Sequence, residues 1–132
     1  MGPPNVMHGH PDNPVLIIDD SEEVLEIFSL LLEAEGYPTL CARDGHTALE
    51  LLQHGVRPFV ILLDWTMPDM DGAELRRHLR EDPSTATIPV VVVTASPPAS
   101  WEDDAPAPLL IKPVDADELL HAVEEHEPGE RR

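Results

Sequence analysis

Five short apolar runs recur along the chain, and turn-forming residues separate each run from the next. They occupy residues 15–19, 39–42, 58–64, 88–94 and 109–111. In the longer runs, valine, isoleucine and leucine stand at consecutive positions, which is typical of parallel strands that are buried on both faces. The pattern therefore predicts five strands of a parallel sheet.

The segments between the runs carry apolar residues at helical spacing. The first helix is predicted to begin after Ser21, a good N-cap, and to end at Gly36, a residue type that commonly closes helices. Its apolar positions are Val24, Ile27, Phe28, Leu31 and Leu32. The later helices carry Ala48, Leu49 and Leu52; Leu75 and Leu79 before Pro83; and, after an Asp115 cap, Leu119, Leu120 and Val123.

Alternating strands and helices imply an α/β fold, in which right-handed crossovers place helices on both faces of the sheet. The segment between the fourth and fifth strands differs, because it holds Pro97, Pro98, Pro106 and Pro108. Proline breaks helices, so at most a turn or two fits around residues 101–105. We therefore expect the fourth helix to be shortened or missing.

The length of 132 residues suits one domain, which we place at 14–126 between flexible tails at 1–13 and 127–132. The formal net charge is −18 at pH 7, and a polyanion repels both nucleic-acid phosphates and anionic membrane surfaces. The N-terminus lacks the pattern of a signal peptide, and no apolar run approaches the ~20 residues that span a bilayer. The lone Cys41 is expected to be a buried hydrophobe, and a chain without a possible internal disulfide fits the cytoplasm.

Polar side chains stand at the ends of the predicted strands. Asp19 and Asp20 follow the first strand, Asp64 ends the third, Thr94 ends the fourth, and Lys112 follows the fifth. In parallel α/β sheets the functional site lies beyond the carboxyl ends of the strands, so we expect these residues to meet at one edge. Three crowded carboxylates are unfavourable unless a cation lies among them, and carboxylate oxygens are typical Mg²⁺ ligands.

The other strand-end groups indicate chemistry on a phosphoryl group. Lys112 is the only lysine among the 8 Lys plus Arg residues, and it ends an expected buried strand beside the acidic cluster, which favours a functional cation over a solvated surface lysine. The Thr94 hydroxyl is able to donate a hydrogen bond to a phosphoryl oxygen. A carboxylate such as that of Asp64 is able to act as the nucleophile, which would give an aspartyl-phosphate.

Four motifs in this order make the chain resemble the receiver domain of two-component response regulators, in particular the single-domain, chemotaxis-regulator type. They are Asp19-Asp20, the segment 64–72 (DWTMPDMDG), Thr94-Ala95 and Lys112-Pro113. The resemblance covers residues 15 to about 125, and the Asp-x-x-Met-Pro-x-Met-Asp-Gly segment is highly specific. It implies a flavodoxin-like, doubly wound, five-stranded parallel sheet.

The resemblance also implies a metal site and a phosphoacceptor. Asp64 would accept the phosphoryl group, and Asp20 would be a direct Mg²⁺ ligand. Asp19 would act on the metal mainly through water, and the backbone carbonyl of Thr66 would be the third protein ligand. Such a protein promotes its own phosphorylation and slow dephosphorylation, and it is not an enzyme acting on other substrates.

Two further residues would act on the phosphoryl group once it is transferred. Thr94 would be the switch hydroxyl, and Lys112 would be the cation that pairs with the phosphoryl group. The bond between Lys112 and Pro113 would be cis. The implied donors are a sensor histidine kinase, a phosphotransfer protein or a small phosphodonor, and the implied target is a downstream protein. The chain itself is expected to be a monomer or a weak dimer.

The sequence departs from the family at the face that usually carries the output. Leu109 stands where the family usually has an aromatic residue, and the segment between Thr94 and Lys112 is shorter than usual by about one helical turn. Output is therefore expected through another surface or a reshaped loop. Trp101 is either an anchor for a partner or a cover for the core, and Trp65 either gates access to Asp64 or simply covers the site.

Two other functions remain to be weighed. A degenerate receiver would bind partners without phosphorylation. The intact acids, hydroxyl and lysine argue against it, while Leu109 and the short segment leave it open. A metal-dependent phosphatase would want a general acid two residues after the nucleophilic aspartate. Thr66 stands there, which disfavours a phosphatase.

Overall fold

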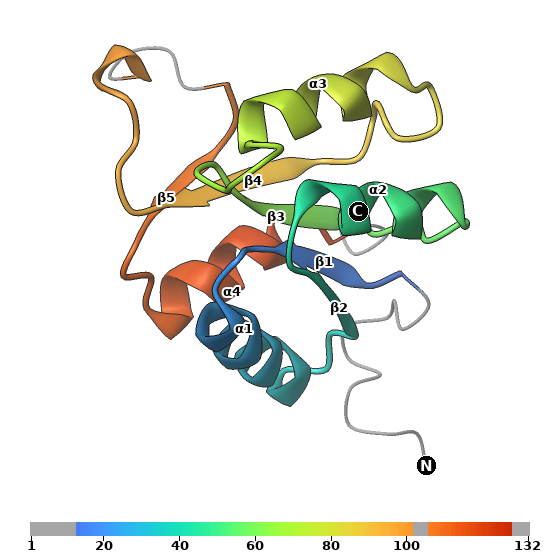
Figure 1. Ribbon diagram of the computed structural model, residues 1–132. Coiled ribbons are helices and arrows are strands. Elements are labelled where there is room, and N and C mark those ends of the chain that lie inside the picture. The colour runs from blue at the N-terminus through green and yellow to red at the C-terminus, as the bar shows by residue number, and fades with distance from the viewer. Residues whose placement is uncertain (1–12, 102–105, 128–132) are drawn as a thin grey trace.

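The computed structural model describes residues 13–101 and 106–127, which contain one five-stranded parallel sheet. The strands are β1 (Val15–Ile18), β2 (Thr39–Ala42), β3 (Val60–Asp64), β4 (Val90–Thr94) and β5 (Leu109–Ile111). Their order is β2-β1-β3-β4-β5, so the chain winds outward in one direction from β1 and then in the other from β3 (Figure 1). This is the doubly wound, flavodoxin-like arrangement that the sequence predicts.

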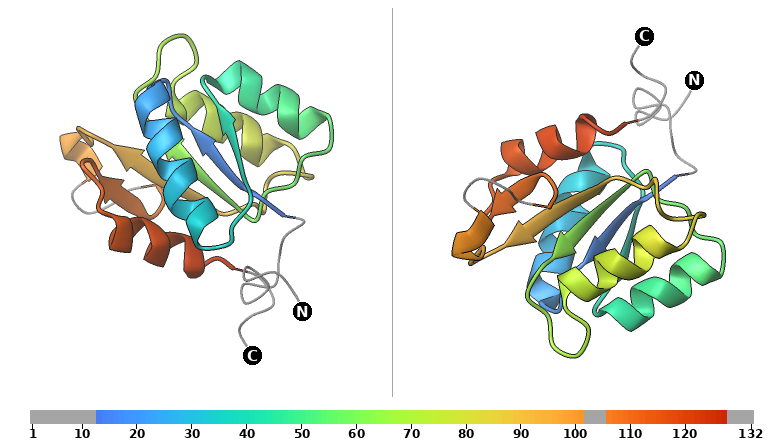
Figure 2. Two further views of the ribbon diagram at one scale, coloured as in Figure 1. Left: turned by 90° about the horizontal axis from the view of Figure 1, so that it is seen from below. Right: turned by 90° about the horizontal axis from the view of Figure 1, so that it is seen from above.

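Four helices cover the two faces of the sheet. They are α1 (Glu22–Ala34), α2 (Gly45–Gln53), α3 (Gly72–Glu81) and α4 (Ala116–Glu124). Helices α1 and α4 lie on one face, and α2 and α3 lie on the other (Figures 1 and 2). Each helix has an N-cap whose side chain accepts a backbone hydrogen bond, and the caps are Ser21, Asp44, Asp71 and Asp115. The predicted caps of the first and last helices are therefore confirmed.

The core has two layers because successive strand residues point to opposite faces. Val15 and Ile17 pack with residues of α1 and α4, whereas Leu16 and Ile18 pack with residues of α2 and α3. All residues of β1 and β3 are buried, since both strands are central and have helices on each side. The aspartates therefore stand at the ends of two strands that are buried along their whole length.

The fifth strand is less buried than the sequence suggests. Ile111 is 53% exposed and Leu109 is half-buried. Between β4 and β5, the described residues form only the 3₁₀ turn Ala99–Trp101, so none of them forms an α-helix that connects these two strands (Figure 1). The expectation of a shortened or missing fourth helix is confirmed, although residues 102–105 of the predicted short turn lie outside the described residues.

Two side chains are more exposed than the sequence indicates. Cys41, expected to be buried, is exposed because β2 is an edge strand, and its Sγ lies 3.1 Å from the Ser29 Oγ. Ile27, placed on the apolar stripe of the first helix, is 47% exposed, whereas its neighbour Leu25 is buried. The helix is therefore rotated slightly from the position that the apolar pattern predicts.

The inner ends of both predicted tails contact the domain. The Asn13 side chain donates to the Arg57 carbonyl at 3.0 Å, and the Tyr37 hydroxyl donates to Glu127 at 3.2 Å. The rest of both tails lies outside the described residues. Among the helices of the described part of the chain, none is long and apolar enough to cross a membrane.

Candidate functional site

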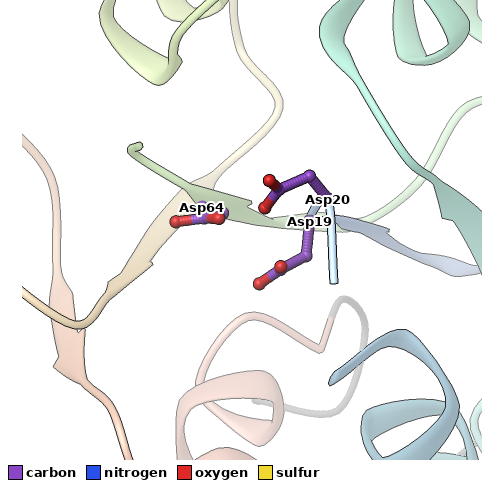
Figure 3. A group of neighbouring side chains, drawn as sticks. All are labelled: Asp19, Asp20 and Asp64. Carbon is purple, nitrogen blue, oxygen red and sulfur yellow. The ribbon is translucent and has the colours of Figure 1, made fainter. Parts of the chain in front are cut away.

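Three carboxylates meet at the carboxyl edge of the sheet. Asp19 and Asp20 directly follow β1 and Asp64 is the last residue of β3, and these two strands are neighbours. One carboxylate oxygen from each residue lies within 4.8 Å of the others. Asp19 and Asp64 are buried and Asp20 is exposed, and Figure 3 shows all three side chains leaving the strand ends on one side. The predicted cluster of acids is therefore present.

The only lysine lies against this cluster. The Lys112 Nζ is 2.8 Å from the Asp19 Oδ2 and 3.8 Å from the Asp64 Oδ2, and the lysine side chain is mostly buried. The Lys112–Pro113 bond is cis, as expected. One ammonium does not balance three carboxylates, so a fully ionised cluster keeps an excess of negative charge.

The carboxylate of Asp19 is held by two donors. The Ser21 backbone N–H donates to Oδ1 at 2.9 Å, and the Lys112 ammonium donates to Oδ2 at 2.8 Å. Ser21 also caps α1 through its side chain, so the start of the helix and the position of Asp19 are coupled. The Ser21 amide was not predicted as a donor to Asp19. An aspartate side chain commonly accepts a hydrogen bond from the backbone N–H two residues later, and this local preference was the available signal.

The carboxyl group of Asp64 is hard to ionise. Burial, and then the negative charge of Asp19, raise its pKa to about 6. The Lys112 ammonium and the Thr66 backbone N–H, which donates to Oδ1 at 3.2 Å, oppose this rise of the pKa. Thr66 itself is an exposed residue of the loop after β3. Asp64 therefore lies where added positive charge would favour its reactive anion.

The threonine predicted for the site lies on the adjacent strand. Thr94 is fully buried and ends β4, one residue beyond Val93, which is paired in register with Asp64. The Ser96 N–H donates a long hydrogen bond to the Thr94 Oγ1 at 3.4 Å. The Lys112 N–H donates to the Thr94 carbonyl at 2.9 Å, which ties the ends of β4 and β5 together.

Two tryptophans link the loops that follow β3 and β4. The rings of Trp65 and Trp101 pack edge to face, with centroids 4.7 Å apart and an interplanar angle of 72°. Gly72, at the start of α3, donates its N–H to the Trp65 carbonyl, and a Cβ at Gly72 would lie 2.7 Å from the Trp65 Cα. Trp101 is half-buried and packs on another loop rather than on the core. The sequence did not predict the contact between the two rings. Gly72 belongs to the motif at 64–72, and the close approach of Trp65 explains why that position is glycine.

The donor set at the strand ends fits a hard divalent cation. Three carboxylates provide oxygens within reach of one ion, one of them from the exposed Asp20. Burial and the charge of Asp19 raise the pKa of Asp64, so a cation held among the carboxylates would favour the Asp64 anion. Carboxylate oxygens with water completing the coordination are the usual Mg²⁺ environment in proteins.

The fold and this site define a class of protein, and comparison with known proteins identifies it. Residues 15–124 match the family model of the response regulator receiver domain. The chain therefore belongs to the receiver domain family of response regulators.

Individual relatives include both curated proteins and solved structures. The chain is 43% identical over 81 residues to response regulator PleD of Caulobacter vibrioides, an alignment that covers 61% of the chain and 18% of PleD. It is 40% identical over 81 residues to the polar-differentiation response regulator DivK of Brucella anthropi, covering 61% of the chain and 65% of DivK. The chain thus spans less than two thirds of each of these relatives.

Two solved structures show the same fold at nearly full length. Chemotaxis protein CheY4 of Vibrio cholerae superposes with a TM-score of 0.77 at 27% identity, covering 86% of the chain and 98% of CheY4. The signal receiver domain of a signal transduction histidine kinase from Syntrophus aciditrophicus superposes with a TM-score of 0.78 at 33% identity. This match covers 91% of the chain and 93% of the receiver domain. The chain is therefore similar both to a chemotaxis protein and to a domain of a larger kinase.

Proposed function

We propose that the chain is a phosphoacceptor receiver in which Asp64 takes a phosphoryl group in a Mg²⁺-dependent reaction. The observation that carries the proposal is the position of the Asp64 carboxylate, close to two further aspartates and 3.8 Å from the Lys112 ammonium. A site that combines a nucleophilic oxygen, metal-binding oxygens and one cation suits phosphoryl transfer, which depends mainly on positioning and charge neutralisation.

The transfer would be an in-line displacement. An Asp64 oxygen attacks the phosphorus of a phosphohistidine on a sensor kinase or phosphotransfer protein, or of a small phosphodonor. The new O–P bond forms as the P–N or P–O bond to the donor breaks, and the donor leaves with the electron pair. Asp19, Asp20, Asp64 and the Thr66 carbonyl would hold Mg²⁺, which when bound neutralises charge on the phosphoryl oxygens.

The proposed signal is a change at the ends of β4 and β5. The phosphoryl group carries negative charge and acceptor oxygens next to the Lys112 ammonium, and it would attract the buried Thr94 hydroxyl. The backbone bond between Lys112 and Thr94 couples these two responses. The shifted loops would then bias binding of a downstream protein in the cytoplasm.

Labelling of the intact protein tests the proposal. Wild type incubated with acetyl phosphate and Mg²⁺ should gain one phosphoryl group by mass spectrometry, and Asp64→Asn should gain none. Asp69→Asn is the matched control, because Asp69 is exposed on the same loop and its φ of 67° suits asparagine. Equal labelling of wild type and Asp64→Asn would show that the nucleophile is misassigned.

A degenerate receiver that binds partners without phosphorylation is the second candidate. It is favoured by the β5 edge of the sheet, where Leu109 is half-buried and the described residues between β4 and β5 form only a 3₁₀ turn. Beryllofluoride, which mimics an aspartyl-phosphate, separates the two. The phosphoacceptor proposal expects beryllofluoride with Mg²⁺ to change Trp65 fluorescence and partner affinity, whereas a degenerate receiver would show neither change.

A further inference from the structure

An arginine-lined trough crosses the surface between α3 and the segment 106–108. It consists of two adjoining hollows, of about 600 and 320 Å³, which share Arg76, Arg80 and Pro106 as lining residues. The larger hollow is lined in addition by Trp65, Ala73, Arg77, Glu81 and Trp101, so its lining holds three arginines and one glutamate. Because the hollows share a wall, they form one elongated depression rather than two separate cavities.

The trough lies beside the segment between β4 and β5, whose described residues form only the 3₁₀ turn Ala99–Trp101. A full helix there would lie on the same face of the sheet as α2 and α3, beside α3 (Figures 1 and 2). Instead, the Arg76 Nη2 donates to the Pro106 carbonyl at 2.7 Å and fixes one wall. This bond joins α3 to the segment 106–108 across the trough.

The charge of the trough is opposite to that of the protein. The chain has 8 Lys plus Arg residues and a net charge of −18, yet three of these cations are Arg76, Arg77 and Arg80. The contact of Arg77 with Glu81 is long, at 4.0 Å, and both side chains are exposed, so it engages the guanidinium weakly. Within the described residues Arg80 forms no ion pair. Burial, and then the charge of Arg80, lower the pKa of Arg76.

We propose that this trough binds an acidic peptide segment of a partner protein that also carries apolar side chains. Carboxylates of the segment bind the guanidinium groups of Arg77 and Arg80, which suit planar carboxylates. Apolar side chains pack against Trp65, Trp101 and Pro106. The elongated shape suits an extended segment, and the two indole rings already pack against each other, so they offer no open slot for a nucleotide base. Binding does not depend on phosphorylation of Asp64.

The test uses the full chain and a fluorescein-labelled synthetic peptide of glutamate, leucine and serine, followed by fluorescence anisotropy. Wild type and Asp64→Asn should bind this peptide, and neither should bind a matched peptide with glutamine in place of glutamate. Arg80→Glu should weaken binding by about tenfold. The control Arg43→Glu alters the net charge equally at an exposed residue outside the trough, and should change affinity less than about twofold.

Four results would overturn the proposal. Equal loss in Arg80→Glu and Arg43→Glu would mean that only net charge matters, and displacement of the peptide by ATP at equal concentration would indicate a nucleotide site. Concentration-dependent dimerisation of wild type that Arg80→Glu abolishes would make a second copy of the chain the occupant. A last variant changes Glu102, Asp103 and Asp104, which lie outside the described residues, to the corresponding amides. If only this variant bound the peptide, the chain's own acids would be the occupant of the trough.

Discussion

Asp64 lies almost entirely out of water beside two other carboxylates, with one ammonium to offset their charge. In this surrounding the anion is destabilised and the neutral acid is favoured, which raises the pKa to about 6. The protein therefore carries an unfavourable charge at neutral pH when no cation is bound. At the scale of single residues, this cost can be measured through stability and through the titration of Asp64 itself.

The first prediction concerns stability against pH in EDTA. The pKa of Asp64 is about 6 in the folded chain and near the ordinary 3.8 when unfolded, so its contribution is fully present below pH ~4 and is lost as pH rises through ~6. The shift corresponds to about 3 kcal/mol at most. Asp64→Asn, which keeps the group neutral, should raise the free energy of unfolding in urea by about 2 kcal/mol at pH 7.5 and by nothing at pH 4. Equal stability at pH 7.5 would contradict the prediction.

The second prediction concerns the ammonium. Lys112 is the positive group that lowers the pKa of Asp64 against the effects of burial and Asp19. Lys112→Met should therefore raise the pKa of Asp64 above about 6, as read from the carboxyl ¹³C shift in an NMR titration without Mg²⁺. Arg43→Met removes an exposed cation elsewhere and serves as the control, with the Asp64 titration unchanged. An unaltered midpoint in Lys112→Met would show that the two groups do not interact.

At the scale of elements, the site depends on how closely the starts of two helices approach the loop that follows β3. Gly72 begins α3 directly against the backbone of Trp65, and Gly45 begins α2 against the side chain of Met70. Both approaches are too close for a Cβ in the present arrangement, but the obstacles differ. A backbone atom blocks Gly72, whereas a flexible thioether blocks Gly45.

This difference predicts opposite tolerance of alanine. Gly72→Ala should lower the free energy of unfolding by about 1–3 kcal/mol and slow labelling of Asp64, because α3 must move away from the loop that follows β3. Gly45→Ala should leave stability within about 1 kcal/mol, since Met70 is able to change rotamer and alanine favours the helix. Urea unfolding of both variants provides the measurement, and equal costs would refute the argument.

At the scale of the whole molecule, the net charge of −18 acts on every folding and binding step. Self-repulsion destabilises the compact state, and dissolved ions screen it within a Debye length of about 10 Å at 0.1 M. Ions thus stabilise the chain in two ways, by general screening and by binding at the three carboxylates. The two contributions are separable because only the second requires the site.

The prediction is a specific effect of Mg²⁺ beyond ionic strength. At equal ionic strength, MgCl₂ should raise the Tm of wild type more than NaCl does, because Mg²⁺ binds the folded state. At a hundredfold excess of Mg²⁺ over Kd, this binding adds about 2.7 kcal/mol to the free energy of unfolding. Asp20→Asn should lose most of the difference and keep the response to NaCl, since Asp20 is the exposed member of the cluster. A similar difference in both proteins would place the binding of Mg²⁺ elsewhere.

Local sequence determined most of the fold and the composition of the site. Apolar periodicity, N-caps and prolines act over a few residues, so they placed the strands, the helices and the reduced segment before β5. The rule that parallel strands end at one edge then brought Asp19, Asp64 and Lys112 together. The contact of Lys112 with Asp19 joins residues 93 positions apart, yet it follows from those local patterns.

Only the tertiary structure decided which of these groups meet water and what lies beside them. Strand order left Cys41 and Ile111 exposed at the two edges of the sheet. Asp19 is buried and Asp20 is exposed, although both aspartates follow the same strand. The contact of Trp65 with Trp101 arises from two loops packing together. Exposure and long-range contacts depend on all neighbouring elements at once, and no short stretch of sequence contains that information.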